Sequence, residues 1–164
     1  MSQEYSNPYE TPAAELVTSN NQNSILEFKR FTAWGVFGLT IITLGFYPLY
    51  WLYTRALVAN SVHSRPISQG LLVTMLVTTI LSVISSFYVV DETMLMVNSV
   101  LSLIYIIVYI TVLFKVRNRL KDILNESNEK MYGVNPVFTL FLSSIYLQYK
   151  INKGIDDCQQ TASS

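Results

Sequence analysis

Two long stretches in mid-chain lack charged residues, and their length sets the first structural expectation. Residues 70–90 and 94–114 are uncharged and mostly apolar. A helix rises about 1.5 Å per residue, so either stretch covers the roughly 30 Å of hydrocarbon in a bilayer. Unpaired backbone groups are costly in lipid, so both are predicted as transmembrane helices. Only Asp91–Thr93 separates them, which predicts an antiparallel hairpin with an acidic tip.

A third uncharged stretch, residues 31–53, has a weak point in its second half. Aromatic residues stand at both of its ends, as is typical of the two membrane interfaces. Gly45 lowers helix stability, and Pro48 removes a backbone donor and clashes with the preceding turn. We therefore predict a kink or break near Gly45–Pro48.

A fourth apolar stretch, residues 134–147, is short for a span. Asn135 is expected to cap its helix and Pro136 to occupy the first helical position. The predicted fold is an all-α integral membrane protein, a small helical bundle in residues 29–153 with two secure spans and two segments that span or re-enter. The membrane-embedded segments are expected at about 31–54, 70–90, 94–114 and 134–150.

The two ends of the chain are polar. Residues 1–28 are rich in Ser, Asn, Gln and Pro, and they cannot bury enough apolar area to offset the entropy of ordering. This segment is predicted to be a disordered tail, and residues 154–164 are predicted to be a second polar tail.

Basic residues near the predicted spans indicate the orientation, because Lys and Arg concentrate on the cytoplasmic side. The Asp91–Thr93 connection has none and is expected to face outward. Two topologies remain open. Four full crossings place both termini outside, whereas re-entrant first and fourth segments place every basic residue in the cytoplasm. The expected location is the bacterial inner membrane, with several passes through it.

The helix after residue 114 is predicted to continue into the cytoplasm. From Lys115 to Asn128 it places apolar residues on one face and charged residues on the other. Its basic residues suit the anionic inner-leaflet surface, where each contributes about 1 kcal/mol. The first interpretation is that this helix anchors the protein to lipid headgroups. The alternative is that it docks a partner protein.

Small polar residues form a candidate polar seam along the predicted hairpin: Thr78, Ser82, Asn98 and Ser102. Such residues let membrane helices approach closely and hydrogen-bond, for about 0.6 to 2 kcal/mol each. Helix packing is one interpretation, and a hydroxyl-lined path for a small solute is the other. The long uncharged stretches contain no Asp, Glu, Lys, Arg or His, so a proton-coupled transporter acting alone is not expected.

One part of the chain echoes another. Thr139–Tyr149 and Thr40–Tyr50 both begin with Thr and place Tyr at the same two later positions. Some transporter folds are built from such repeats. The echo therefore suggests that the first and fourth segments are related in shape.

Composition narrows the function classes. The 164-residue chain is 51% hydrophobic and 13% charged, and 11 Lys and Arg balance 11 Asp and Glu. The chain therefore lacks the basic excess typical of nucleic-acid binding. Cys158 is the only cysteine, and His63 is the only histidine and is expected to be a solvated loop residue. No catalytic group, cofactor site or metal site is predicted, and the protein is expected not to be an enzyme.

Residues 43–51 read Thr-Leu-Gly-Phe-Tyr-Pro-Leu-Tyr-Trp. This run resembles the Thr-Leu-Gly-Ile-Tyr-x-x-Tyr-Trp core of an uncharacterised family of small bacterial inner-membrane proteins, known only as a domain of unknown function. Phe46 replaces the isoleucine. The similarity extends over residues 30–153 and includes Tyr146–Asn152. It implies membrane residence and a helical fold, and it brings no activity.

Two functional hypotheses follow. The first is a non-enzymatic small subunit or modulator that contacts another membrane protein. Its candidate contact motif comprises Thr43, Gly45, Tyr47, Pro48, Tyr50 and Trp51. The alternative is an oligomeric pore or transporter component with a path along the polar seam. The expected partners are the lipid bilayer and either a membrane protein or further copies of the chain.

Overall fold

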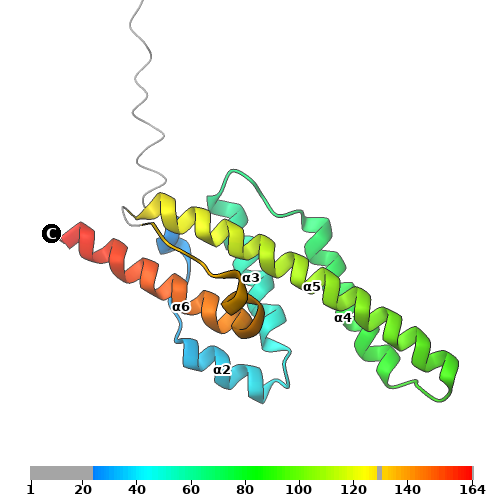
Figure 1. Ribbon diagram of the computed structural model, residues 1–164. Coiled ribbons are helices and arrows are strands. Elements are labelled where there is room, and N and C mark those ends of the chain that lie inside the picture. Colours follow the sequence, from blue (N-terminus) through cyan, green and yellow to red (C-terminus); the bar gives the residue numbers. More distant parts are fainter. Residues whose placement is uncertain (1–23, 129–130, 164) are drawn as a thin grey trace, which may run out of the picture.

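The structure is a computed structural model that describes residues 24–128 and 131–163 (Figure 1). This part of the chain is helical and contains no strand, which confirms the predicted all-α class. A short 3-10 helix precedes five α-helices: η1 (Ser24–Glu27), α2 (Ala33–Ile42), α3 (Tyr47–Val62), α4 (Gln69–Ser86), α5 (Glu92–Ser127) and α6 (Pro136–Ser163).

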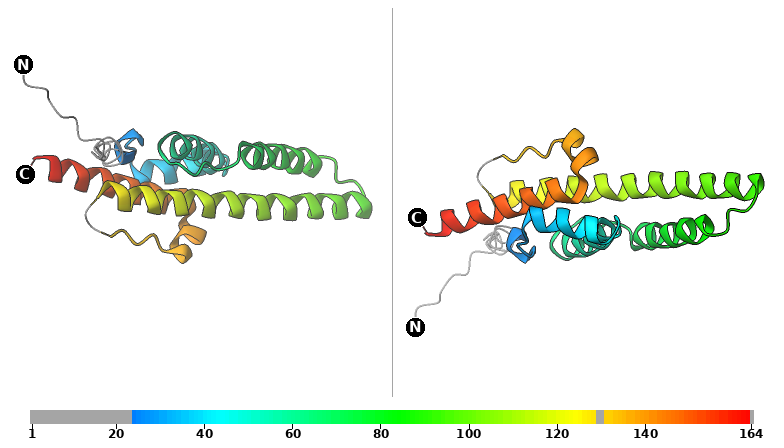
Figure 2. Two further views of the ribbon diagram at one scale, coloured as in Figure 1. Left: turned by 90° about the horizontal axis from the view of Figure 1, so that it is seen from above. Right: turned by 90° about the horizontal axis from the view of Figure 1, so that it is seen from below.

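Helices α4 and α5 form the predicted hairpin, which projects beyond the other helices (Figure 2). Asp91 caps the start of α5, because its Oδ1 accepts a hydrogen bond from the backbone N of Met94 at 2.8 Å. Both helices are long and apolar enough to cross a bilayer. Only 22% and 11% of their apolar windows are buried, unlike the core helix of a soluble domain.

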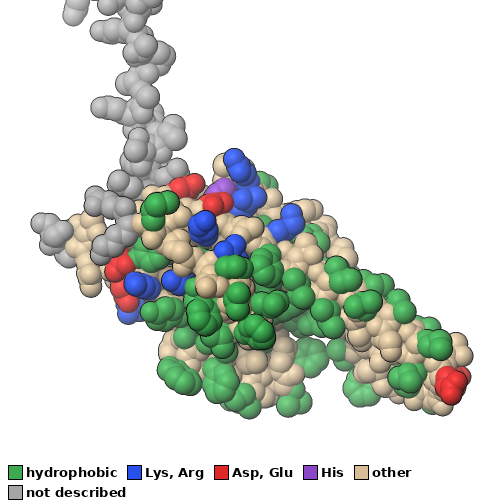
Figure 3. All heavy atoms as spheres, in the orientation of Figure 1, with side chains coloured by type: hydrophobic (Ala, Val, Ile, Leu, Met, Phe, Trp, Pro, Cys, Tyr) green, Lys and Arg blue, Asp and Glu red, His purple; other side chains and the backbone are tan. Residues whose placement is uncertain are grey.

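The hydrophobic core lies at the opposite end of the molecule from the hairpin tip. Every buried residue of α5 falls between Val112 and Ser127, where α5 packs against α3, α6 and η1. Figure 3 shows that the basic side chains in view lie over this end, that acidic side chains lie here and at the hairpin tip, and that the hairpin between shows apolar and uncharged atoms. The apolar face predicted for Lys115–Asn128 is therefore core, and only its charged face is open to a lipid surface or partner.

Residues from both predicted tails contact the core. Ile25 and Phe28 are buried in the core, and the backbone N of Ile25 donates to Ser127 Oγ at 3.2 Å. The folded part therefore begins before residue 29, while residues 1–23 of the predicted tail lie outside the described residues. At the other end, α6 continues past residue 153 and Ile155 is buried.

The break predicted near Gly45–Pro48 is confirmed: α2 ends at Ile42, and α3 begins at Tyr47. Helix α3 continues past residue 54 to Val62 and buries Arg55. The bounds of the predicted membrane-embedded segment stay a prediction. The predicted number of four membrane-embedded segments stays a prediction. Helix α2 has only 10 residues, and α6 departs from helical geometry at Ser143.

Replacing Gly45 by alanine is expected to destabilise the fold by about 1–2 kcal/mol, because its φ of +90° lies in the region that disfavours a Cβ. Gly38 provides a matched control inside α2, where an added Cβ meets open space. Gly38→Ala is expected to stabilise by about 0.5–1 kcal/mol. Unfolding in mixed micelles, followed by circular dichroism, measures both changes. Shifts of the same sign would contradict the assigned backbone geometry.

Candidate functional site

The break between α2 and α3 is built by the first half of the candidate contact motif. Thr43 Oγ1 donates to the Leu39 carbonyl at 2.7 Å and accepts from the backbone N of Tyr47 at 2.9 Å, so one side chain serves both helix ends. Gly45 supplies the positive φ, and Pro48 lies in the first turn of α3. These three residues position the turn.

The aromatic residues of the motif point to different surroundings. Tyr50 is 64% exposed, and its ring centre lies 6.1 Å from that of Tyr47, which is partly buried. Trp51 is only 2% exposed, and its Nε1 donates to Gln148 Oε1 at 2.8 Å. An external partner can therefore reach Tyr50, whereas Trp51 joins α3 to α6.

A buried polar network surrounds Gln148. Arg55 Nη2 donates to Gln148 Oε1 and to the Lys29 carbonyl, both at 3.0 Å. Gln148 Nε2 donates to Asn152 Oδ1 at 2.9 Å, and Asn152 Nδ2 donates to the Phe31 carbonyl at 2.7 Å. The network therefore ties α6 both to α3 and to the segment that precedes α2.

Arg55 is a buried cation in this network. It is 8% exposed, and its guanidinium lies 5.7 Å from the centre of the Trp51 ring. Among the described residues, no salt bridge involves Arg55, and its buried Nε has no hydrogen-bond partner. Burial lowers the pKa of Arg55 below its ordinary value. Neutral carbonyl oxygens and an aromatic face therefore take the place of a carboxylate.

Sequence reasoning did not identify this network. Two features of the sequence point to it. Gln148 is the one amide within an apolar stretch of α6, and Arg55 is the first charged residue after the uncharged stretch that begins at residue 31. An isolated polar residue in such a position needs a buried partner. The identity of that partner could not be read from the sequence, because the network joins residues that are far apart in the chain.

The echo between Thr40–Tyr50 and Thr139–Tyr149 has a counterpart in the backbone. Leu44 has a φ of 50° and Ser143 a φ of 40°, and each is the fifth residue of its stretch. Positive φ is uncommon for residues other than glycine. The two stretches therefore each contain a positive-φ residue at the matching position, where the helical geometry breaks.

Part of the predicted polar seam lies between α4 and α5, and part hydrogen-bonds within α4. The hydroxyl oxygens of Ser82 and Ser102 are 3.1 Å apart, and Ser85 Oγ donates to Asn98 Oδ1 at 2.7 Å. Thr78 instead donates to carbonyls of its own helix. Three of the four predicted seam residues therefore take part in hydrogen bonds between the two helices.

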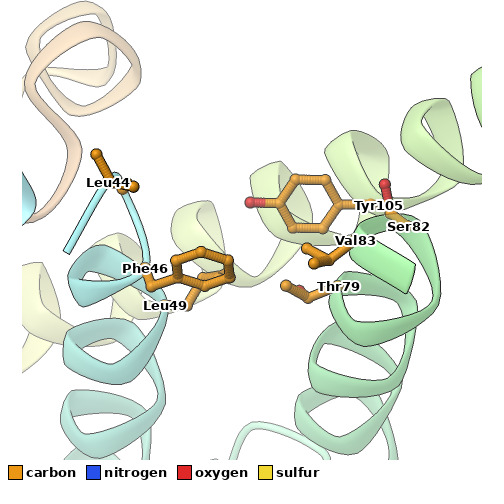
Figure 4. Close-up of a pocket in the computed structure, with 8 residues that line it drawn as sticks. Leu44, Phe46, Leu49, Thr79, Ser82, Val83 and Tyr105 are labelled. Atoms are coloured by element: carbon orange, nitrogen blue, oxygen red, sulfur yellow. The ribbon is translucent and has the colours of Figure 1, made fainter. Parts of the chain in front are cut away.

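A cleft lies between α3 and α4, and Figure 4 shows Phe46 and Leu49 facing Thr79 and Val83 across it. Its outer part has a volume of about 470 Å³. A smaller adjoining part of about 160 Å³, which we call the inner part because it reaches α5 at Tyr105, is also lined by Leu44 and Gly45. The turn of the contact motif therefore forms one wall of an apolar space, which we name the α3–α4 cleft.

His63 is not the solvated loop residue that was expected. Its side chain is 6% exposed, and its Nε2 lies 3.8 Å from Asp122 Oδ2 and 3.9 Å from Glu126 Oε1 on α5. Its Nδ1 accepts a hydrogen bond from the backbone N of Arg65 at 3.0 Å. Within the ranges that the structure describes, no group of three or more His, Cys, Asp or Glu side chains is arranged to hold a metal ion.

Comparison with models of protein families finds a match to the chain. The model of the family described as a domain of unknown function, DUF4234, matches residues 31–157. The chain belongs to this family. The DUF4234 region includes both backbone breaks, the α4–α5 hairpin and the side chains of Arg55, Gln148 and Asn152. No curated protein and no solved structure matches the chain.

Proposed function

We propose that this DUF4234 protein is an integral membrane protein whose α4–α5 hairpin crosses the bilayer. The support is the apolar surface of the hairpin: Val73, Ile84, Leu103 and Ile107 are each at least half exposed. Apolar patches of this extent are rare on soluble monomers. Hydrocarbon accommodates them without cost, and both helices have the length to cross it.

The charge distribution supports an inner-membrane location with cytoplasmic termini. Asp91 and Glu92 lie at the hairpin tip, while Arg65 and Lys121 lie toward the other end of the hairpin helices. The side richer in Lys and Arg faces the cytoplasm. A fluorescent reporter fused after residue 160 is expected to be active in cells. Activity of a periplasmic reporter at the same site would reverse the orientation.

Within the membrane, we propose that the protein acts without catalysis, as a small subunit or modulator that contacts a helix of another membrane protein. The observation that carries this proposal is a second exposed apolar surface, formed by α2, the turn after it and the first part of α6. It includes Trp34, Ile42, Leu44 and Phe141, each at least 77% exposed. Helix α2 contacts α6, so the two broken helices that carry these residues are neighbours. We name it the broken-helix surface.

A photoreactive amino acid placed at Leu44 or at Phe141 tests this proposal in intact cells. Both positions are expected to crosslink to the same protein, because both belong to the broken-helix surface. Val100 on α5 is a matched control: it is 58% exposed but lies on the hairpin. Absence of a discrete protein adduct from Leu44 and Phe141, or the same adduct from Val100, would count against a specific contact surface.

A pore or transporter component formed by several copies is the second candidate. The matching breaks at Leu44 and Ser143 favour it, because discontinuous helices in corresponding positions line the substrate sites of many transporters. Ser82, Asn98 and Ser102 are hydrogen-bonded within the hairpin, so a path would have to form where copies meet. Adducts from Leu44 and Phe141 that contain only further copies of the chain would favour this candidate.

A further inference from the structure

The α3–α4 cleft separates two helices that are neighbours in sequence. Only residues 63–68 join α3 to α4. Along the outer part of the cleft, Leu49 and Tyr53 lie on the α3 side, and Leu76 and Ile80 lie on the α4 side. Small-molecule pockets commonly measure about 300–1,000 Å³, so the 470 Å³ of this part suits a small ligand.

The lining of the cleft selects an uncharged, apolar occupant. No Asp, Glu, Lys, Arg or His side chain lines either part. The Thr and Ser hydroxyls that line it are engaged: Thr79 Oγ1 donates to the Met75 carbonyl at 2.7 Å, and Ser82 pairs with Ser102. The other polar groups of the lining are the neutral phenol hydroxyls of Tyr50, Tyr53 and Tyr105. A charged ligand would therefore lose its hydration without gaining an oppositely charged partner.

The position of the cleft identifies the source of the occupant. Ile80 and Ile84 line the outer part, and both are also at least half exposed on the surface of α4. The mouth of the cleft is therefore continuous with the α4 surface that we assign to the bilayer. The apolar molecules present there in bulk are the acyl chains of lipids.

We propose that the α3–α4 cleft holds one acyl chain of a bilayer lipid, an inference that rests on the proposed insertion of the α4–α5 hairpin. The acyl chain passes Tyr50 and Ile84, which line the outer part and are at least half exposed, and it lies against Leu49 and Thr79. Leu49 is 7% exposed and Thr79 is 8% exposed, so bulk lipid around the protein does not reach them. These two side chains therefore report occupancy of the cleft rather than simple contact with the membrane.

Photolabelling of the full-length protein in liposomes tests the inference. The probe is a phosphatidylcholine that carries a diazirine in the middle of one acyl chain, and peptide mass spectrometry locates the adducts. Labelling is expected at the exposed hairpin residues Val73 and Ile107 and also at Leu49 and Thr79. Labelling of Val73 and Ile107 alone would overturn the cleft proposal while leaving membrane insertion intact. Absence of labelling at all four would overturn both.

A matched pair of substitutions on α4 separates cleft binding from general contact. Val83→Trp fills the junction of the inner and outer parts and is expected to reduce labelling of Leu49 and Thr79 at least fivefold. Val77→Trp adds the same bulk at an exposed position outside the lining and is expected to leave that labelling unchanged. Val73 and Ile107 should be labelled equally in both variants, which shows that each is folded and inserted. Labelling of Leu49 and Thr79 that persists in Val83→Trp would overturn the proposal.

Discussion

Replacing Trp51 by alanine is expected to destabilise the protein by about 3–5 kcal/mol, the usual cost of removing a buried large aromatic side chain. Trp51 is 2% exposed, stacks near the Arg55 guanidinium and donates to Gln148. Its loss opens a cavity between α3 and α6 and exposes the charge of Arg55 to that cavity. Equilibrium unfolding in mixed micelles measures the change.

The chain contains one other tryptophan, which provides the control. Trp34 is 79% exposed, so Trp34→Ala is expected to change stability in micelles by no more than about 0.5 kcal/mol. Trp51→Phe keeps most of the packing but removes the Nε1 donor, and about 0.5–1.5 kcal/mol is the expected loss. Equal losses for Trp34→Ala and Trp51→Ala would show that Trp51 is not a core residue.

Replacing Gln148 by leucine is expected to cost about 2–4 kcal/mol, because an unsatisfied buried group costs about 1–3 kcal/mol and a charged one costs more. Gln148 is fully buried, and its Oε1 accepts from both Trp51 and Arg55. In the variant, Arg55 Nη2 keeps only the Lys29 carbonyl. The same unfolding experiment measures the loss.

A double-mutant cycle identifies the source of this loss. Arg55→Leu removes the buried charge that donates to Gln148 Oε1. The Arg55→Leu, Gln148→Leu double variant is therefore expected to lose less stability than the sum of the two single variants. Gln159→Leu, at an exposed position of the same helix, is the control and should change stability by no more than about 0.5 kcal/mol. Additive single effects, or equal losses from Gln159→Leu and Gln148→Leu, would refute the assigned network.

The candidate contact motif both forms the break between α2 and α3 and exposes an aromatic side chain, and its sequence alone did not show which residue does which. Its Thr, Gly and Pro residues satisfy local backbone requirements, so the break that they cause was predictable from adjacent positions. Whether Tyr50 or Trp51 faces outward depends on the direction in which α3 leaves the turn. Helix α3 packs against α5, α2 and α6, and Gln148 of α6 accepts the hydrogen bond from Trp51. The exposed part of the motif is therefore smaller than the sequence indicated.

The sequence by itself determined the helical class, the α4–α5 hairpin and the break after α2, because these depend on local properties: apolar length, the acidic connection, and the backbone limits of Gly45 and Pro48. Only the tertiary structure decided that Ile25 and Phe28 dock on the core, that α3 continues through Arg55, and that His63 lies beside α5. In each case the stabilising partner lies on a segment distant in sequence. In the sequence, Arg55 marks the end of an uncharged stretch. The folded protein can bury its guanidinium because the Lys29 carbonyl and Gln148 Oε1 accept hydrogen bonds from it. These partners come within reach only once the helices have packed.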